Sequence, residues 1–224
     1  MRLHLLSKRA IESGLPAIIL AVPLLINPYG YCIYLNPEVA FFRFATLLLL
    51  TAWLVDVINL RESTAGSLRR LFTRPLVIPV LIFASTHVLS TITSVDPHLS
   101  FWGSHFRAYG ICTVLCYVIF FFLIILNFNT LRQIERLITI VLLASLPVAL
   151  YGVLQHSGIE PVFPGKDYSI QVISTIGNPI FLGAYLIMVI PLTFGRWLVS
   201  LRILLRRGQP ALSRRSTLLE VVGY

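Results

Sequence analysis

The fold class of this chain follows from one apolar stretch, Val39-Ala-Phe-Phe-Arg-Phe-Ala-Thr-Leu-Leu-Leu-Leu-Thr-Ala-Trp-Leu-Val-Asp-Val-Ile-Asn-Leu60. As a helix it is apolar on nearly all sides, and its length matches the roughly 20 residues that cross a membrane. Similar runs are expected at residues 15–34, 75–93, 109–127, 137–156 and 179–199. The sequence therefore predicts an all-α, polytopic transmembrane helix bundle with about six spans. We expect residues 1–224 to form a single integral-membrane helical domain.

The composition excludes several other classes of protein. Of the 224 residues, 57% are hydrophobic and 12% are charged, and the mean hydropathy is +0.84. An average soluble domain has about twice this charged share, so a cytosolic globular protein and a disordered chain are both excluded. Although the pI is near 9.9, the basic residues interrupt apolar runs instead of covering a polar surface. Nucleic acid is therefore not an expected partner.

The positions of Lys and Arg predict the orientation of the chain in the membrane. Both termini and alternate loops carry 15 basic residues on one side, whereas the loops of the other side carry 2, Arg107 and Lys166. Because Lys and Arg are enriched in cytoplasmic loops, both termini are expected to be cytoplasmic. The 15 residues are Arg2, Lys8, Arg9, Arg61, Arg69, Arg70, Arg74, Arg132, Arg136, Arg196, Arg202, Arg206, Arg207, Arg214 and Arg215.

Two charged residues lie inside the predicted span 39–60. Arg43 and Asp56 are separated by about 20 Å along one helix and cannot pair with each other. We favour the interpretation that each side chain extends to the nearer membrane surface. The alternative is that each finds a partner on another helix.

Other polar residues and the cysteines inside the spans are expected to have structural roles. The span 75–93 contains hydroxyl residues and His87, which we expect to face other helices, with His87 a bundle residue rather than a catalyst. The cysteines lack the spacing of a metal site and are expected to pack as small apolar residues, so no metal or cofactor is predicted. The residues concerned are Ser85, Thr86, Ser90, Thr91, Cys32, Cys112 and Cys116.

The first informative outer loop lies between residues 93 and 110. Asp96-Pro97 is typical of the start of a turn. Arg107 stands at the outer start of the next span, where the positive-inside bias makes an arginine unusual. Its planar guanidinium suits two-point contact with a phosphate or a carboxylate. The alternative is that Arg107 anchors the chain to lipid headgroups.

The second informative outer loop contains Gly177-Asn178-Pro179, which leads directly into a predicted span. Pro179 suits the first position of a helix. Such a helix start leaves backbone N–H donors near the outer surface, which is a geometry that binds anions. An ordinary N-capped membrane helix explains the same residues.

Two segments in these loops resemble a known family. Ser94-Val-Asp-Pro-His-Leu-Ser-Phe-Trp-Gly-Ser104, followed by Arg107-Ala-Tyr-Gly110, resembles the signature loop of bacterial O-antigen ligase-like and O-antigen polymerase-like membrane proteins. Ser174-Thr-Ile-Gly-Asn-Pro-Ile-Phe-Leu-Gly-Ala-Tyr-Leu186 is similar to that family's Gly-Asn-Pro-Asn-Phe-Leu segment. Ile180 stands where the family has its second Asn, so a side-chain role at this position is not carried over.

The resemblance implies transfer of a glycan from a polyprenyl-pyrophosphate carrier to an acceptor at the outer face of the bacterial inner membrane. The acceptor would be a lipid A core, a growing glycan or a protein hydroxyl, and no nucleotide sugar or metal is needed. Arg107 would neutralise the leaving pyrophosphate, and Asn178 would lie at the substrate site with it. Family members place the candidate catalytic His in a second half. This chain is therefore expected to be the N-terminal part of a longer protein, inactive alone, with its catalytic residues unknown.

Two other functions remain as alternatives. A non-enzymatic membrane protein, either a transporter half or a scaffold, fits six spans with both ends inside. Transport would predict internal repeats and polar residues near the membrane midplane, whereas the polar residues here collect near the outer ends. A membrane protease would need nucleophile and base or metal motifs at matched depths, and the sequence contains none.

Overall fold

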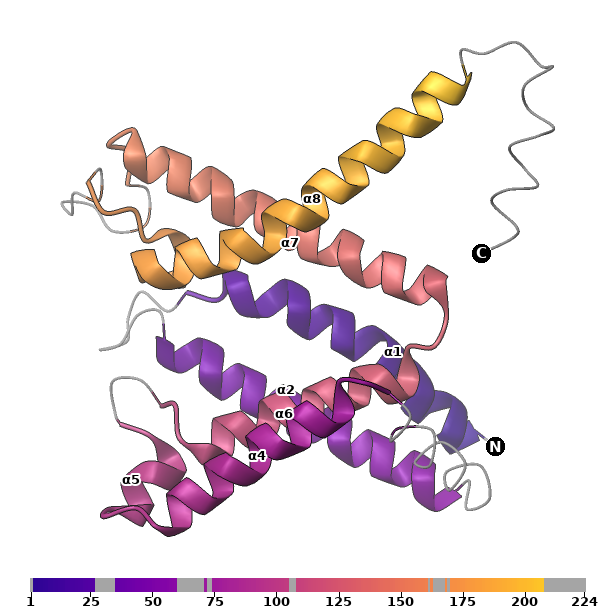
Figure 1. Cartoon of the computed structure of the whole chain (residues 1–224), viewed down its shortest axis with the longest axis vertical. Helices are drawn as coiled ribbons and strands as arrows, with labels where there is room; N and C mark the ends of the chain where they lie inside the picture. The colour runs from indigo at the N-terminus through magenta and orange to yellow at the C-terminus, as the bar shows by residue number, and fades with distance from the viewer. Residues whose placement is uncertain are drawn as a thin grey trace. The chain divides into compact units, whose positions relative to one another are not determined.

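The computed structural model describes residues 2–26, 35–59, 71, 74–104, 108–160, 162, 168 and 170–207, drawn as ribbons in Figure 1. Within this part of the chain all regular elements are helices, so the all-α prediction is confirmed. The elements are α1 (Arg2–Ala21), η1 (Val22–Leu24), α2 (Leu35–Asn59), α4 (Val77–Ile92), α5 (Pro97–Trp102), α6 (Ile111–Asn127), α7 (Leu131–His156), η2 (Ser174–Ile176) and α8 (Pro179–Arg207).

Several of these helices have the length and composition of membrane spans. The segments Pro37–Ile58, Leu131–His156 and Pro179–Leu205 are long and apolar enough to cross a membrane. The helices α4 and α6 are also apolar but have 16 and 17 residues, which corresponds to about 24–26 Å of helix. The length and composition of these helices support the prediction of a membrane protein, whereas the all-α class is observed directly.

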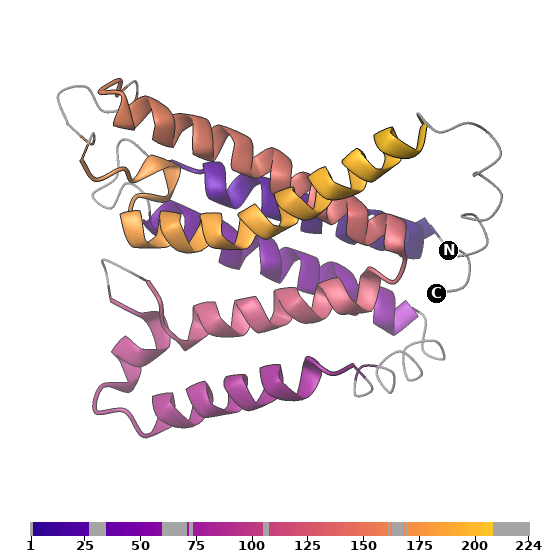
Figure 2. The same cartoon turned by 45° about the horizontal axis from the view of Figure 1, so that its top comes forward.

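The chain divides into two compact units, Met1–Gly183 and Ala184–Tyr224. In the first unit α1 packs on α2, α6 and α7, while α6 packs also on α2 and α4. The helices α2 and α6 begin on the side of the unit where α5 lies, and α1, α4 and α7 end on that side (Figures 1 and 2). We call this the α5 end of the unit.

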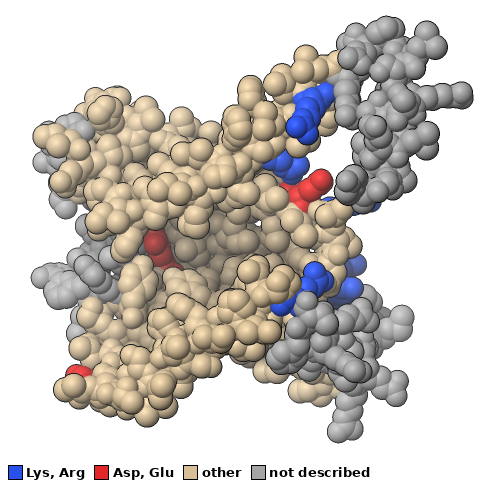
Figure 3. Space-filling view, in the orientation of Figure 1, with Lys and Arg blue, Asp and Glu red and all other residues tan. Residues whose placement is uncertain are grey.

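The opposite end of the first unit carries its basic side chains. Figure 3 shows Lys and Arg gathered on the side where α1, α4 and α7 begin, and we call this the basic end. The described basic residues at this end are Lys8, Arg9, Arg74, Arg132 and Arg136. Arg43 lies in the other half of α2, toward the α5 end.

The predicted first span is wrong in its position. We expected a span at 15–34, but the helix is α1, which ends at Ala21 and includes the charged N-terminal segment. Residues 27–34 lie outside the described part. Two features explain the difference: Pro23 cannot continue the α-helical hydrogen-bond ladder, and Ile11, Leu15 and Ile18 form one buried face, between 0% and 4% exposed. The sequence from Arg2 therefore gains its stability as an amphipathic helix packed on α2, α6 and α7.

Two further helices differ from the prediction at their ends. The helix α7 begins at Leu131 instead of residue 137, because Thr130 and Gln133 form a capping box that satisfies N–H groups at its start. The helix α8 continues to Arg207 instead of ending at residue 199.

Near the α5 end, the expected turn at Asp96 is present. The Asp96 side chain accepts a hydrogen bond from Leu99 N at 3.0 Å and starts the short helix α5.

We expected the hydroxyl residues of α4 to face other helices, but at least two of them are exposed and form hydrogen bonds within α4. Ser85 Oγ and Thr86 Oγ1 donate to carbonyl oxygens of α4 itself, each at 2.8 Å, and both residues are exposed. His87 Nδ1 lies 3.0 Å from the Phe83 carbonyl oxygen of the same helix. A hydroxyl can satisfy itself on the carbonyl three or four residues earlier, so these residues need no partner helix.

Candidate functional site

The loop between α5 and α6 is tied to the bundle by Arg43 of α2. Arg43 Nε donates to Thr113 Oγ1 at 2.8 Å, and Arg43 Nη2 donates to the Trp102 carbonyl oxygen at 3.2 Å and to the Ala108 carbonyl oxygen. Thr113 is 1% exposed and donates to the Ala108 carbonyl oxygen at 2.8 Å. One guanidinium therefore binds the chain on both sides of residues 103–107, using the several donors that only arginine offers.

This arrangement corrects our interpretation of the charged residues in α2. Arg43 does not simply extend to the membrane surface; its partners are a residue of α6 and the adjacent loop. Asp56 likewise has a partner on another helix, because it accepts a hydrogen bond from Ser7 Oγ of α1 at 3.1 Å. Both side chains are half-buried, and a charge withdrawn from water is costly without such partners. The alternative, a partner on another helix, therefore applies to both.

Two glycines close the same loop. Gly103 has φ +85, and a Cβ added there would lie 2.5 Å from the backbone nitrogen of Tyr109. A Cβ at Gly110 would overlap the backbone carbonyl of Phe101. The two sides of the loop are therefore in backbone contact. The contacting segments are Trp102-Gly103 and Tyr109-Gly110. No side chain fits at either position without a shift of the backbone.

Arg107 lies in residues 105–107, outside the described part of the chain, as does Lys166 of the second loop. The residues on both sides of this gap, Ser104 and Ala108, are described, and Ala108 N donates to the Ser104 carbonyl oxygen at 2.7 Å. Arg43 and Thr113 both bind the carbonyl oxygen of Ala108, the first described residue after this gap.

The second loop is organised by a buried glutamine at the end of α7. Gln155 is 1% exposed, and its Oε1 accepts from the backbone N–H groups of Ile173 and Ser174 at 3.2 and 2.7 Å. Its Nε2 donates to Glu160 Oε2 at 2.8 Å, and the hydroxyl of Tyr151 donates to Glu160 Oε1. This network fixes the segment before Asn178 against α7, because each buried polar group has a partner.

Asn178 acts as the N-terminal cap of α8. Its Oδ1 accepts a hydrogen bond from the Ile180 N–H at 2.8 Å, and Pro179 occupies the first helical position. The preceding Gly177 has φ +76, a left-handed conformation that turns the chain into the helix. The Asn178 side-chain oxygen therefore has the role expected for an ordinary N-capped helix.

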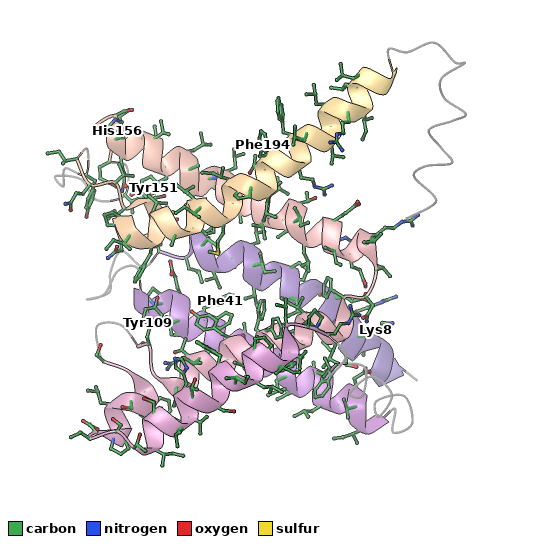
Figure 4. All side chains as sticks on the ribbon, viewed as in Figure 1. Lys8, Phe41, Tyr109, Tyr151, His156 and Phe194 are labelled. Atoms are coloured by element: carbon green, nitrogen blue, oxygen red, sulfur yellow. The ribbon has the colours of Figure 1, made fainter. Side chains whose placement is uncertain are left out.

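One aromatic contact brings the two loops together. The rings of Tyr109 and Phe181 meet edge to face with centroids 6.5 Å apart, and Phe181 follows Asn178 by three residues. Both residues belong to the first unit. In Figure 4 the labelled residues Tyr109, Phe41, Tyr151 and His156 all lie toward the α5 end, opposite Lys8. The two segments that the sequence singled out therefore meet at one end of this unit.

Sequence reasoning missed several residues of this end. Gln155, Tyr151 and Glu160 organise the second loop, and nothing in the spacing of these residues indicated their network. Glu38, in the first turn of α2, has a buried Oε1 with no hydrogen-bond partner among the described residues. A carboxylate at the start of a largely apolar helix was an available signal, because ionisable residues in membrane helices are often functional.

The described polar residues at the α5 end position its loops: Arg43 binds the loop between α5 and α6, and Gln155 and Asn178 fix the segment that leads into α8. Within this part of the chain no group of three or more His, Cys, Asp or Glu residues could hold a metal ion. Comparison with models of protein families, with curated proteins and with solved structures finds no match for this chain. The resemblance to O-antigen ligase-like proteins accordingly rests on the two loop segments.

Proposed function

We propose that this chain is part of a membrane enzyme that transfers a glycan from a polyprenyl-pyrophosphate carrier to an acceptor at the outer face of the bacterial inner membrane. In this proposal about six helical segments cross the membrane, among them α2, α7 and α8, and the α5 end faces the outside. Both termini then lie in the cytoplasm. The glycan would belong to the lipopolysaccharide or another polysaccharide of the cell envelope.

The observation that carries the proposal is the contact between Tyr109 and Phe181. It supports a shared site, because it joins the two segments that resemble the O-antigen ligase-like family. These segments are far apart in the sequence, and the packing of the bundle brings them into contact at one end of the first unit. The concentration of Lys and Arg at the basic end supports the orientation, because basic residues remain on the cytoplasmic side.

Each residue of this site has a distinct proposed task. Arg107 binds the carrier pyrophosphate and neutralises the charge that develops as it leaves. Arg43 is a positioning residue, since its hydrogen bonds to Trp102 and Ala108 hold the loop that carries Arg107. Asn178 shapes the rim of the site by fixing the start of α8. The base that receives the acceptor proton is not assigned.

Binding of the carrier by the purified chain tests the proposal without requiring turnover. We expect a short-chain polyprenyl pyrophosphate to bind in detergent, with Arg107→Lys weakening binding roughly tenfold to over a hundredfold, since a lost charge-assisted contact costs about 1.5–3 kcal/mol. The matched control is Arg132→Lys, an exposed arginine at the basic end. If Arg107→Lys binds as tightly as the unaltered chain, Arg107 is a lipid anchor and the site assignment fails.

The orientation has a separate test in intact cells. In a variant whose natural cysteines are replaced, single cysteines at His98 and Lys166 should react with a membrane-impermeant maleimide. A cysteine at Arg70 should react only after the membrane is permeabilised, because it lies among the basic residues expected in the cytoplasm. Reaction of the Arg70 cysteine in intact cells would reverse the arrangement.

A further inference from the structure

An apolar cavity opens between α2, α4 and α6 toward the basic end of the first unit. Its volume is about 320 Å³, at the lower limit of pockets that hold small molecules. It reaches from the middle of α2 to the last turn of α6 and the start of α4. The lining residues are Leu50, Trp53, Leu71, Val77, Leu81, Ile119, Phe122, Leu123 and Leu126.

The lining determines what the cavity can hold. Every lining side chain is apolar apart from the indole N–H of Trp53, so water would find few hydrogen-bond partners inside. An unfilled cavity also forfeits the dispersion contacts of the atoms around it. In a helix bundle surrounded by lipid, a hydrocarbon chain is the occupant that restores these contacts without desolvating a polar group.

Arg74 lies in the chain between two of the residues that line the cavity. Leu71 and Val77 both line it, and the turn between them is closed by hydrogen bonds from Arg74 N to the Leu71 carbonyl oxygen at 2.9 Å and from Val77 N to the Arg74 carbonyl oxygen at 3.2 Å. The Arg74 side chain is exposed. An exposed cation therefore stands beside two lining residues in the chain, at the basic end of the unit. This pairing of charge and apolar space matches a lipid with an anionic head and an acyl tail.

We propose that this cavity binds one acyl chain of an anionic glycerophospholipid, whose phosphate contacts Arg74. The lipid comes from the leaflet at the basic end. This site lies at the opposite end of the unit from the loops assigned to the glycan carrier, so the two proposals stand or fall separately.

Trp53 provides the measurement, because it lines the cavity and brominated acyl chains quench tryptophan fluorescence on contact. The chain contains 3 tryptophans, and Trp102→Phe with Trp197→Phe leaves Trp53 as the single emitter. The purified full chain in detergent is titrated with dibrominated phosphatidylglycerol and with dibrominated phosphatidylcholine. We expect saturable quenching by both lipids, with about fivefold tighter binding of phosphatidylglycerol, the effect of one arginine beside an anionic lipid.

Two variants and one control separate the head and tail contacts. Arg74→Gln should remove the preference for phosphatidylglycerol, whereas Arg132→Gln, another exposed arginine at the basic end, should leave it intact. Leu81→Phe places a ring in the cavity at a residue that is 37% exposed, and should lower the maximal quenching. Equal binding of the two lipids by the unaltered cavity overturns the proposal, as does an unchanged preference in Arg74→Gln. Displacement by a polyprenyl phosphate but not by phosphatidylglycerol also overturns it.

Discussion

Arg43 Nε donates a hydrogen bond of 2.8 Å to Thr113 Oγ1, joining α2 to α6 across 70 positions of sequence. The same guanidinium binds the carbonyl oxygens of Trp102 and Ala108. A single arginine in an apolar helix thus fixes a loop that is distant in sequence. Its charge is compensated by a hydroxyl and two carbonyl dipoles, which are acceptors that remain available where carboxylates are scarce.

Replacing Thr113 with Val should destabilise the first unit and loosen the loop. The change keeps the side-chain volume but removes an acceptor of Arg43 and the donor to the Ala108 carbonyl oxygen. Leaving a buried donor without its partner costs about 1–3 kcal/mol. We expect a lower midpoint of thermal unfolding in detergent. The control is Thr86→Val, whose hydroxyl is exposed and bonds only within α4, and equal shifts for the two variants would contradict this role.

Gly110→Ala should disrupt the loop between α5 and α6, because the added Cβ would overlap the Phe101 carbonyl. Overpacking of this kind costs typically about 1–3 kcal/mol. Gly183→Ala is a matched control, since its Cβ would meet no atom within 4 Å, and in a helix this change is neutral or stabilising. Thermal unfolding of both variants provides the comparison. The geometry of the loop is refuted if Gly110→Ala unfolds at the same temperature as the unaltered chain.

Gln155→Leu should release the segment before Asn178. The variant retains the size of the side chain but leaves the N–H groups of Ile173 and Ser174 without an acceptor and removes a donor to Glu160. Each buried group left unpaired costs about 1–3 kcal/mol. Hydrogen exchange at residues 173–176 should become faster. Gln171→Leu, at an exposed position, should leave the exchange unchanged, and slow exchange in both variants would show that Gln155 does not organise the loop.

Two replacements of Asn178 separate its role as a cap from any further role of its amide. Asn178→Ala removes the acceptor for the Ile180 N–H and should destabilise the start of α8 by about 0.5–2 kcal/mol. Asn178→Ser retains a capping oxygen and should restore stability. Carrier binding should follow the same order, because the proposed task of Asn178 is to fix the rim. If the Ser variant is stable but binds no carrier, the amide itself contacts the ligand.

The helices were largely predictable because their signal is local. The apolar runs give α4 and α6 within about two residues of the expected ends, and Asp96 and Pro97 mark the start of α5 by side-chain and backbone rules that act within one turn. The error in α1 has a corresponding cause. Its apolar face, formed by Ile11, Leu15 and Ile18, is buried only because α2, α6 and α7 pack against α1. Hydropathy along the sequence does not record this packing, and it placed the span at residues 15–34.

The fold class and the two distinctive loop segments follow from the sequence, since burial of apolar surface and turn chemistry depend on neighbouring residues. Only the tertiary structure decided which groups those segments contact. Arg43 reaches Thr113, Gln155 reaches Ser174 and Tyr109 reaches Phe181 because packed helices bring distant positions within hydrogen-bond or ring-contact range. Such partners are selected by the cost of leaving a buried charge or amide unpaired, and that cost depends on three-dimensional surroundings that no local pattern records.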